Sequence, residues 1–186
     1  MPPKAKITEE MIIDAGFEIA RECGAENINA RTISSKLGCS TQPVMYHFKR
    51  IEDIKKAVYQ KVDKYHTAYI TDFHGKEPMK EIGLSYIRFA AEEKHFFRFL
   101  FQSNEFSEKH ITDLVNAEEA APLLAIFGDG ADISKKQAKE IFRILFLFAH
   151  GYASIFANNS LEFDEDMILA DLESVFAGAV SQEGMQ

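Results

Sequence analysis

Apolar side chains recur every three to four residues along most of this 186-residue chain, and this spacing constrains the fold more than any other feature. It is the period of an α-helix with one buried face. No segment of any length shows the apolar and polar alternation typical of a half-buried strand. The sequence therefore predicts an all-α protein.

The first fifty residues contain signals for three short helices. Thr8 is a suitable N-cap, two glutamates follow it, and Gly24 ends the apolar series. A second helix is expected from about Asn29 to Gly38, and a third from Ser40, its expected cap, to about residue 48. The apolar series of the first helix is Ile12, Ala15, Ile19 and Cys23.

Longer helices are expected in the rest of the chain. One runs from about Glu52 to Phe73 and ends at a break around Gly75 and Pro78. We expect an N-terminal domain, residues 1–50, joined through this helix to a larger domain, residues 51–186. The remaining helices are predicted at 79–93, 95–102, 107–127, 134–158 and 163–180.

Charge is distributed unevenly along the chain. Residues 1–66 hold 11 Lys and Arg against 9 Asp and Glu, a net charge of +2, whereas the remainder holds 10 against 20, a net charge of −10. Such asymmetry is typical of a chain with one part that faces a polyanion. The alternative is that acidic helices keep the larger part soluble.

The sequence also indicates a cytoplasmic protein that does not bind membranes. No apolar run reaches the roughly 18 residues that cross a bilayer, and the richest stretch, Ile141–Phe156, is interrupted by Arg143 and His150. The basic N-terminus has no apolar stretch behind it, unlike a secretion signal. Cys23 and Cys39 alone provide no disulfide framework.

The segment 30–48 has the pattern of a helix-turn-helix, because two short helices flank a turn that contains Gly38. Gln42 can read adenine through two hydrogen bonds, and Thr41 can bind a base or a phosphate. The alternative is a pair of packed helices with an ordinary polar face. The residues expected to close the angle between the helices are Ile33, Leu37, Val44 and Phe48. Those expected to face outward are Thr41, Gln42, Met45, Tyr46 and His47.

Over residues 12–54 the chain resembles the TetR family of transcriptional regulators. The resemblance is carried by Ile12-Ile-Asp-Ala-Gly-Phe-Glu-Ile-Ala-Arg-Glu-Cys-Gly, Arg31-Thr-Ile-Ser, Leu37-Gly-Cys-Ser-Thr-Gln-Pro, His47-Phe-Lys and Glu52-Asp-Ile. The matched span covers about a quarter of the chain. The resemblance implies a dimeric repressor that binds a palindromic operator in double-stranded DNA and is released by a small-molecule effector.

Two positions depart from the family pattern. Members usually carry Tyr, a phosphate contact, at the place of Met45, and often Lys at the place of Ile51. These two positions lack the usual side chains for backbone contacts, and Lys49, Arg50 and Lys55 lie nearby in the sequence to compensate. The DNA-binding residues that the resemblance and the helix pattern indicate are Arg31, Thr32, Ser40, Thr41, Gln42, Pro43, Met45, Tyr46, His47, Lys49 and Lys55.

The two C-terminal helices are the expected dimer surface. Residues 141–157 are apolar almost all round, so this helix must be buried on more than one side. The resemblance implies that both helices pair with their copies in a homodimer, whereas a monomer whose core buries both is the alternative. The apolar stripe of the last helix is Ile168, Leu172, Val175, Phe176 and Ala179.

The middle of the chain is rich in Phe, and the resemblance implies a pocket there for an apolar or aromatic effector. Phe at helical spacing is also the ordinary composition of a core. The effector would swing the helix from Glu52 and separate the two DNA-binding units, while an activator or nucleoid factor without an effector is the alternative reading. The candidate pocket residues are Tyr86, Phe89, Phe97, Arg98, Phe101, Phe127 and His150. The other phenylalanines of this region are Phe96, Phe99 and Phe106.

Other chemistries are not indicated. The chain has no Gly-rich phosphate loop, Gly-x-Ser-x-Gly elbow, HExxH or Glu-x-x-His pair, so we expect no enzyme and no cofactor. His47, His66 and His74 have no metal-ligand spacing, and we expect no metal site. Cys39 is expected to be a small buried residue rather than a redox-active thiol.

Overall fold

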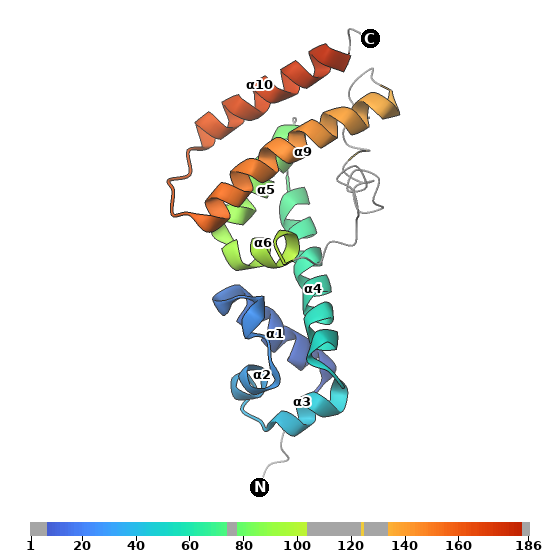
Figure 1. Cartoon of the computed structure of the whole chain (residues 1–186), viewed down its shortest axis with the longest axis vertical. Helices are drawn as coiled ribbons and strands as arrows, with labels where there is room; N and C mark the ends of the chain where they lie inside the picture. Colours follow the sequence, from blue (N-terminus) through green and yellow to red (C-terminus); the bar gives the residue numbers. More distant parts are fainter. Residues whose placement is uncertain (1–6, 74–77, 104–123, 125–133, 184–186) are drawn as a thin grey trace. The chain divides into compact units, whose positions relative to one another are not determined.

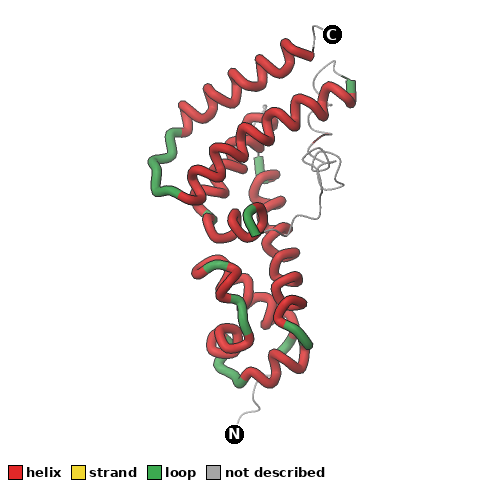
Figure 2. Tube along the Cα trace, viewed as in Figure 1, coloured by secondary structure: helices red, strands yellow, loops and turns green. Residues whose placement is uncertain are grey.

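The computed structural model describes residues 7–73, 78–103, 124 and 134–183. Every regular element in these residues is a helix and none is a strand, which confirms the all-α prediction (Figure 2). The helix predicted at 107–127 lies outside the described residues. The described parts of Met1–Thr67 and His95–Glu105 form one compact unit, and those of Ala68–Lys94 and Phe106–Gln186 form a second. The functional division expected after residue 50 stays a prediction.

The first unit begins with the helix that the sequence predicted from its cap. Thr8 accepts a hydrogen bond from the Met11 backbone N–H at 3.2 Å and starts α1 (Glu9–Cys23). Gly24 ends α1 with φ +94°, a backbone conformation that suits glycine. A short 3-10 helix, η1 (Ala25–Asn27), then leads to α2 (Ala30–Lys36) and α3 (Thr41–His47).

The core of the first unit depends on close contact between α1 and α4 (Ile51–Thr71). A Cβ at Gly16 of α1 would lie 2.6 Å from Cγ2 of Val58, so only glycine lets the two helices approach this far. Arg21 and Lys61 lie over the rings of Tyr65 and Phe17 at 5.6 and 5.3 Å, and so add cation–π contacts to the same surface. The long helix α4 is therefore held against α1 from Val58 to Tyr65.

Helix α6 (Lys94–Phe101) completes this core with aromatic side chains. Phe96 is fully buried, with its ring centroid 4.6 Å from that of Phe17 and 5.8 Å from that of Tyr65. The Tyr59 hydroxyl donates to the Leu100 carbonyl at 3.3 Å. A segment more than forty residues away in the sequence thus supports the N-terminal helices.

The second unit is built around α9 (Lys135–Asn158), which packs against α5 (Pro78–Glu92) and α10 (Glu165–Glu183) (Figure 1). A reciprocal capping box between Ser134 and Gln137 starts α9. Gly83 of α5 brings α10 close, because a Cβ there would lie 3.3 Å from both Cδ atoms of Leu172. The ion pairs Lys80–Glu173 and Arg88–Glu165 join the same two helices.

By length and composition alone, helix α9 is long and apolar enough to cross a bilayer. The sequence argument required an unbroken apolar run, and the charged residues within this helix interrupt such a run. One such helix is weak evidence for a membrane span, because core helices of globular proteins pass the same test. Ile141, Phe142 and Phe156 of α9 are buried among its neighbours. Packing within the chain therefore accounts for part of its apolar composition, while Leu147 and Ile155 of the same helix are exposed.

Candidate nucleic-acid interface

Helix α2, a tight turn and helix α3 form the helix-turn-helix that the sequence predicted. Asn29 caps α2: its side-chain oxygen accepts from the backbone N–H groups of Arg31 and Thr32 at 3.0 and 3.1 Å, and the Asn29 N–H donates to the Thr32 hydroxyl at 3.2 Å. Gly38 has φ +63°, in the left-handed region that a tight turn between helices requires. The Cys39 N–H then donates to the Ser34 carbonyl at 3.0 Å and closes the turn.

Helix α3 has one buried and one exposed face. Val44 is 0% exposed and Ile33 of α2 is equally buried, so these two residues close the angle between the helices as predicted. Tyr46 is 83% exposed, and its phenol stands away from the core. The exposed residues of α3 are Thr41, Gln42, Met45 and Tyr46. This face combines hydrogen-bonding groups with a large aromatic and a flexible apolar side chain, the types that read base edges and backbone.

The segment that carries this face has a positive net charge. No carboxylate occurs between Glu26 and Glu52, whereas this segment holds four Lys and Arg residues. Lys36 pairs with Glu22 at 2.9 Å, but within the described part of the chain the exposed Arg31 and Lys49 form no ion pair. Arg31 and Lys49 precede and follow α3 on one carboxylate-free segment, a charge pattern that suits a polyanion.

Arg50 belongs to the protein's own structure more than to this surface. Its guanidinium bonds the Asp53 carboxylate at 2.9 Å in the first turn of α4. This hydrogen bond lowers the pKa of Asp53 and raises the pKa of Arg50. Arg50, which was expected to compensate for missing backbone contacts, therefore already has a carboxylate partner within the chain.

The structure corrects four local expectations. His47 does not face outward: its Nε2 lies 2.9 Å from the Ile7 carbonyl oxygen. Ser40 occupies the N-cap position of α3, but its side chain makes no capping hydrogen bond. Cys23 is exposed rather than part of the apolar face of α1, and Cys39 is half-buried rather than buried. These differences arise from neighbours that local spacing does not specify.

All eleven predicted DNA-binding residues lie in the first unit, but they differ in accessibility. The Thr32 hydroxyl lies 2.7 Å from the Asn27 carbonyl and forms the capping box, so it serves the protein. Pro43 and Lys55 are half-buried. The exposed members are Arg31, Ser40, Thr41, Gln42, Met45, Tyr46 and Lys49. Contact with DNA stays a prediction for each of them.

The candidate effector residues do not fall in one unit. Phe97, Arg98 and Phe101 belong to the first unit. Tyr86, Phe89 and His150 belong to the second, and Phe127 lies outside the described residues. Phe89 and Phe97 are fully buried, which fits the core alternative for these two rings.

Tyr86 and His150 form a polar pair inside an aromatic cluster of the second unit. The Tyr86 hydroxyl lies 2.9 Å from His150 Nδ1, and Phe146 stacks on His150 at 5.7 Å between ring centroids. Burial raises the pKa of Tyr86 well above its usual value and lowers the pKa of His150. Both groups are therefore neutral near pH 7. Both residues are among the pocket candidates predicted from the sequence, but their pairing was not predictable because they are 64 positions apart.

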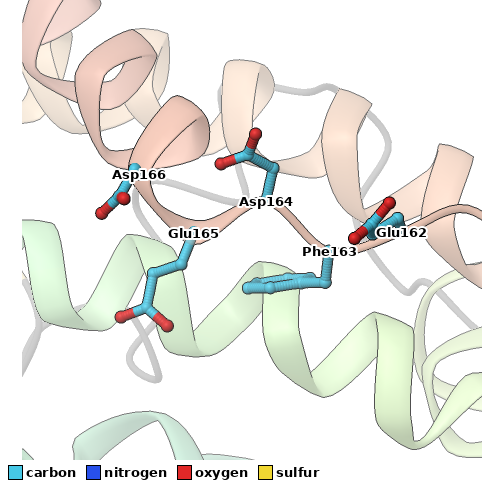
Figure 3. A pocket seen from close by; sticks show the side chains of 5 residues that line it. All are labelled: Glu162, Phe163, Asp164, Glu165 and Asp166. Atoms are coloured by element: carbon cyan, nitrogen blue, oxygen red, sulfur yellow. The ribbon is translucent and has the colours of Figure 1, made fainter.

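A surface pocket of about 500 Å³ lies where the chain enters α10 (Figure 3). Four of its five lining side chains are carboxylates, which does not suit an apolar effector; the lining residues are Glu162, Phe163, Asp164, Glu165 and Asp166. Asp164 caps α10 by accepting from the Met167 N–H at 3.0 Å, and acidic residues favour a helix N-terminus. The described residues contain no His, Cys, Asp or Glu group suited to a metal ion.

The chain is similar in sequence to a known helix-turn-helix transcriptional regulator. The chain is 22% identical over 172 residues to the uncharacterized HTH-type transcriptional regulator YobS of Bacillus subtilis (strain 168). This similarity covers 90% of the chain and 88% of the relative, and so extends well beyond the helix-turn-helix. No family model matches the chain. The comparison supports transcription regulation as the class of function.

Proposed function

We propose that the chain is a cytoplasmic transcriptional repressor of the TetR type, which binds a palindromic operator as a homodimer and leaves it when a small effector binds. The exposed face of α3 is the main support for DNA binding. Val44, on the opposite face, is buried and fixes the helix in the core, and the surrounding segment contains no carboxylate. The full-length similarity to a helix-turn-helix transcriptional regulator supports it.

In this proposal α3 enters the major groove with its N-terminal residues against the bases. Thr41 and Gln42 are the first two residues of the helix and are exposed. Gln42 can bond both N6 and N7 of an adenine. Arg31 and Lys49 bind phosphates on either side and fix the register of the helix in the groove.

Gln42→Ala should relax sequence choice without removing binding. We expect a loss of about 1–3 kcal/mol of discrimination at one base pair in each half-site. Lys49→Ala is the matched contrast, because losing a phosphate contact weakens all DNA alike and reduces the salt slope by about one for each subunit bound. Sequence preference is measured on a randomised duplex library, and an unchanged preference for Gln42→Ala contradicts this placement of the recognition face.

The second unit presents an apolar surface suited to a second copy of the chain. Leu147 and Ile155 of α9 and Met167 of α10 are exposed although they are large and apolar. The stripe that the sequence predicted on α10 is instead mostly buried within the single chain, at Ile168, Leu172 and Ala179. Gly151 lies between the first two on the same face, and Gly178 on α10 is also exposed; a Cβ at either would meet nothing within 4 Å. An isologous dimer through this surface presents two copies of α3, which a palindromic operator requires.

Ile155→Asp should convert the dimer to a monomer. Ile155 is 51% exposed in the single chain, and burying a carboxylate in its place leaves a charge without a partner. The dissociation constant of the dimer should rise by at least about a hundredfold, measured by analytical ultracentrifugation. Ala68→Asp, at an exposed position of α4, is the control and should leave the dimer intact. A variant that still sediments as the wild type does argues against this dimer surface.

The effector response rests on the aromatic cluster around Tyr86 and His150. Neutral polar groups inside an aromatic environment suit a small apolar or aromatic molecule with one hydrogen-bonding group. Such a ligand acts only as far as it binds the DNA-free conformation more tightly than the DNA-bound one. The test is displacement of the protein from its selected duplex by a panel of neutral aromatic compounds, and a panel without any effect argues for regulation without an effector.

A further inference from the structure

His47 connects two parts of the first unit that are forty residues apart in the sequence. It is the last residue of α3, and its Nε2 lies 2.9 Å from the carbonyl oxygen of Ile7. Ile7 directly precedes Thr8, the N-cap of α1. The His47 Nδ1 lies 3.7 Å from the carboxylate of Glu9 in the first turn of α1. Both ring nitrogens therefore face the start of α1 rather than solvent.

The contact matters because α3 is only seven residues long. A helix of two turns has few internal hydrogen bonds and takes its orientation from tertiary contacts. Val44 anchors one turn in the core, and His47, three residues later, lies on the same side of the helix. Val44 and His47 together help to fix how deeply α3 packs into the core and how it is rotated about its own axis.

The orientation of the neighbouring side chain follows from this anchor. The ring of Tyr46 meets that of His47 edge to face, with centroids 5.5 Å apart and an interplanar angle of 88°. Tyr46 is exposed while only 20% of the His47 side chain is. Tyr46 thus points to the surface because His47, the next residue in α3, is held against the start of α1.

We propose that His47 is a positioning residue for DNA recognition: by donating from Nε2 to the Ile7 carbonyl, it fixes the angle at which α3 presents Thr41, Gln42 and Tyr46. This inference rests on the proposed function. It replaces the sequence-based expectation that His47 itself contacts DNA. The imidazole acts through the protein, and the Glu9 carboxylate beside its Nδ1 would disfavour a phosphate there.

The test compares His47→Ala with His47→Gln on a duplex that the wild-type protein selects from a randomised library. The alanine variant should bind this duplex about tenfold more weakly, because α3 loses one of its two anchors. Binding to a scrambled duplex and the slope of affinity against salt should stay as in the wild type. Glutamine can place an amide N–H near the position of Nε2, so it should restore most of the affinity.

A direct phosphate contact gives different results. The salt slope would then fall by about one for each subunit bound, and both duplexes would lose affinity together. That outcome, or wild-type affinity for His47→Ala, overturns the inference. If the alanine variant does not fold by circular dichroism, His47→Leu fills the same space without a donor and is read in the same way. A wild-type protein that selects no duplex instead contradicts the proposed function.

Discussion

Phe96→Ala is expected to lower the free energy of unfolding by about 3–5 kcal/mol, the usual cost of removing a fully buried Phe. The Phe96 ring lies between Phe17 of α1 and Tyr65 of α4, with centroid distances of 4.6 and 5.8 Å. Its removal leaves a cavity where these helices meet. Because domains of this size are stable by about 5–15 kcal/mol, the loss is a large part of the total.

Urea unfolding followed by circular dichroism measures this effect. Leu161→Ala is the control, since Leu161 is apolar but exposed between α9 and α10, and its unfolding midpoint should stay near that of the wild type. Equal midpoints for Phe96→Ala and the wild type would show that α6 is not part of the core that supports the helix-turn-helix.

Stability is also expected to fall on acidification because of His66. This residue is buried against the edge of the Phe101 ring, and burial lowers its pKa from 6.5 to about 4. Above pH 6.5 the imidazole is neutral in both the folded and the unfolded chain. As pH falls from 6.5 toward 4, the unfolded chain binds a proton that the folded chain does not, and the loss reaches about 3 kcal/mol.

The contribution of His66 is isolated by comparing unfolding free energies at pH 7 and pH 4.5. His66→Phe keeps a buried ring without a titrating group, so it should lose about 2–3 kcal/mol less than the wild type over this interval. His95→Phe removes a half-buried histidine of the same unit and should follow the wild type. If His66→Phe loses as much stability as the wild type, the imidazole binds its proton over the same pH range in the folded and the unfolded chain, which contradicts a pKa lowered by burial.

Helix positions were largely predictable because their signals are local. The Thr8 cap, the Gly24 stop and the opening of α2 at Asn29 depend on residues within one turn of the helix end. The helix expected over 134–158 is α9 (Lys135–Asn158), and that expected over 52–73 is α4 (Ile51–Thr71). Apolar spacing determines such elements without knowledge of their partners.

The inward orientation of His47 was not predictable in the same way. Periodicity places residue 47 on the edge of the exposed face, but the Ile7 carbonyl that binds it belongs to the start of α1, forty residues earlier. The burial of Phe96 likewise depends on α6 packing beside α1 and α4. Contacts of this length in sequence depend on tertiary packing, which no local pattern encodes.

The candidate effector residues show the same limit more strongly. Composition identified an aromatic middle region, but could not separate the buried core residues Phe89 and Phe97 from the hydrogen-bonded pair of Tyr86 and His150. The two halves of the expected residue set also belong to different compact units. A phenylalanine has the same sequence signature in a core and in a pocket wall.

The central claim is that the exposed face of α3 recognises duplex DNA by sequence. Its most direct test is the ratio of the wild-type protein's affinity for its best library-selected duplex to its affinity for a scrambled duplex of the same length and composition. The account predicts a ratio of at least about a thousand at physiological salt. Equal affinity for the two duplexes, or no binding to either, would contradict it.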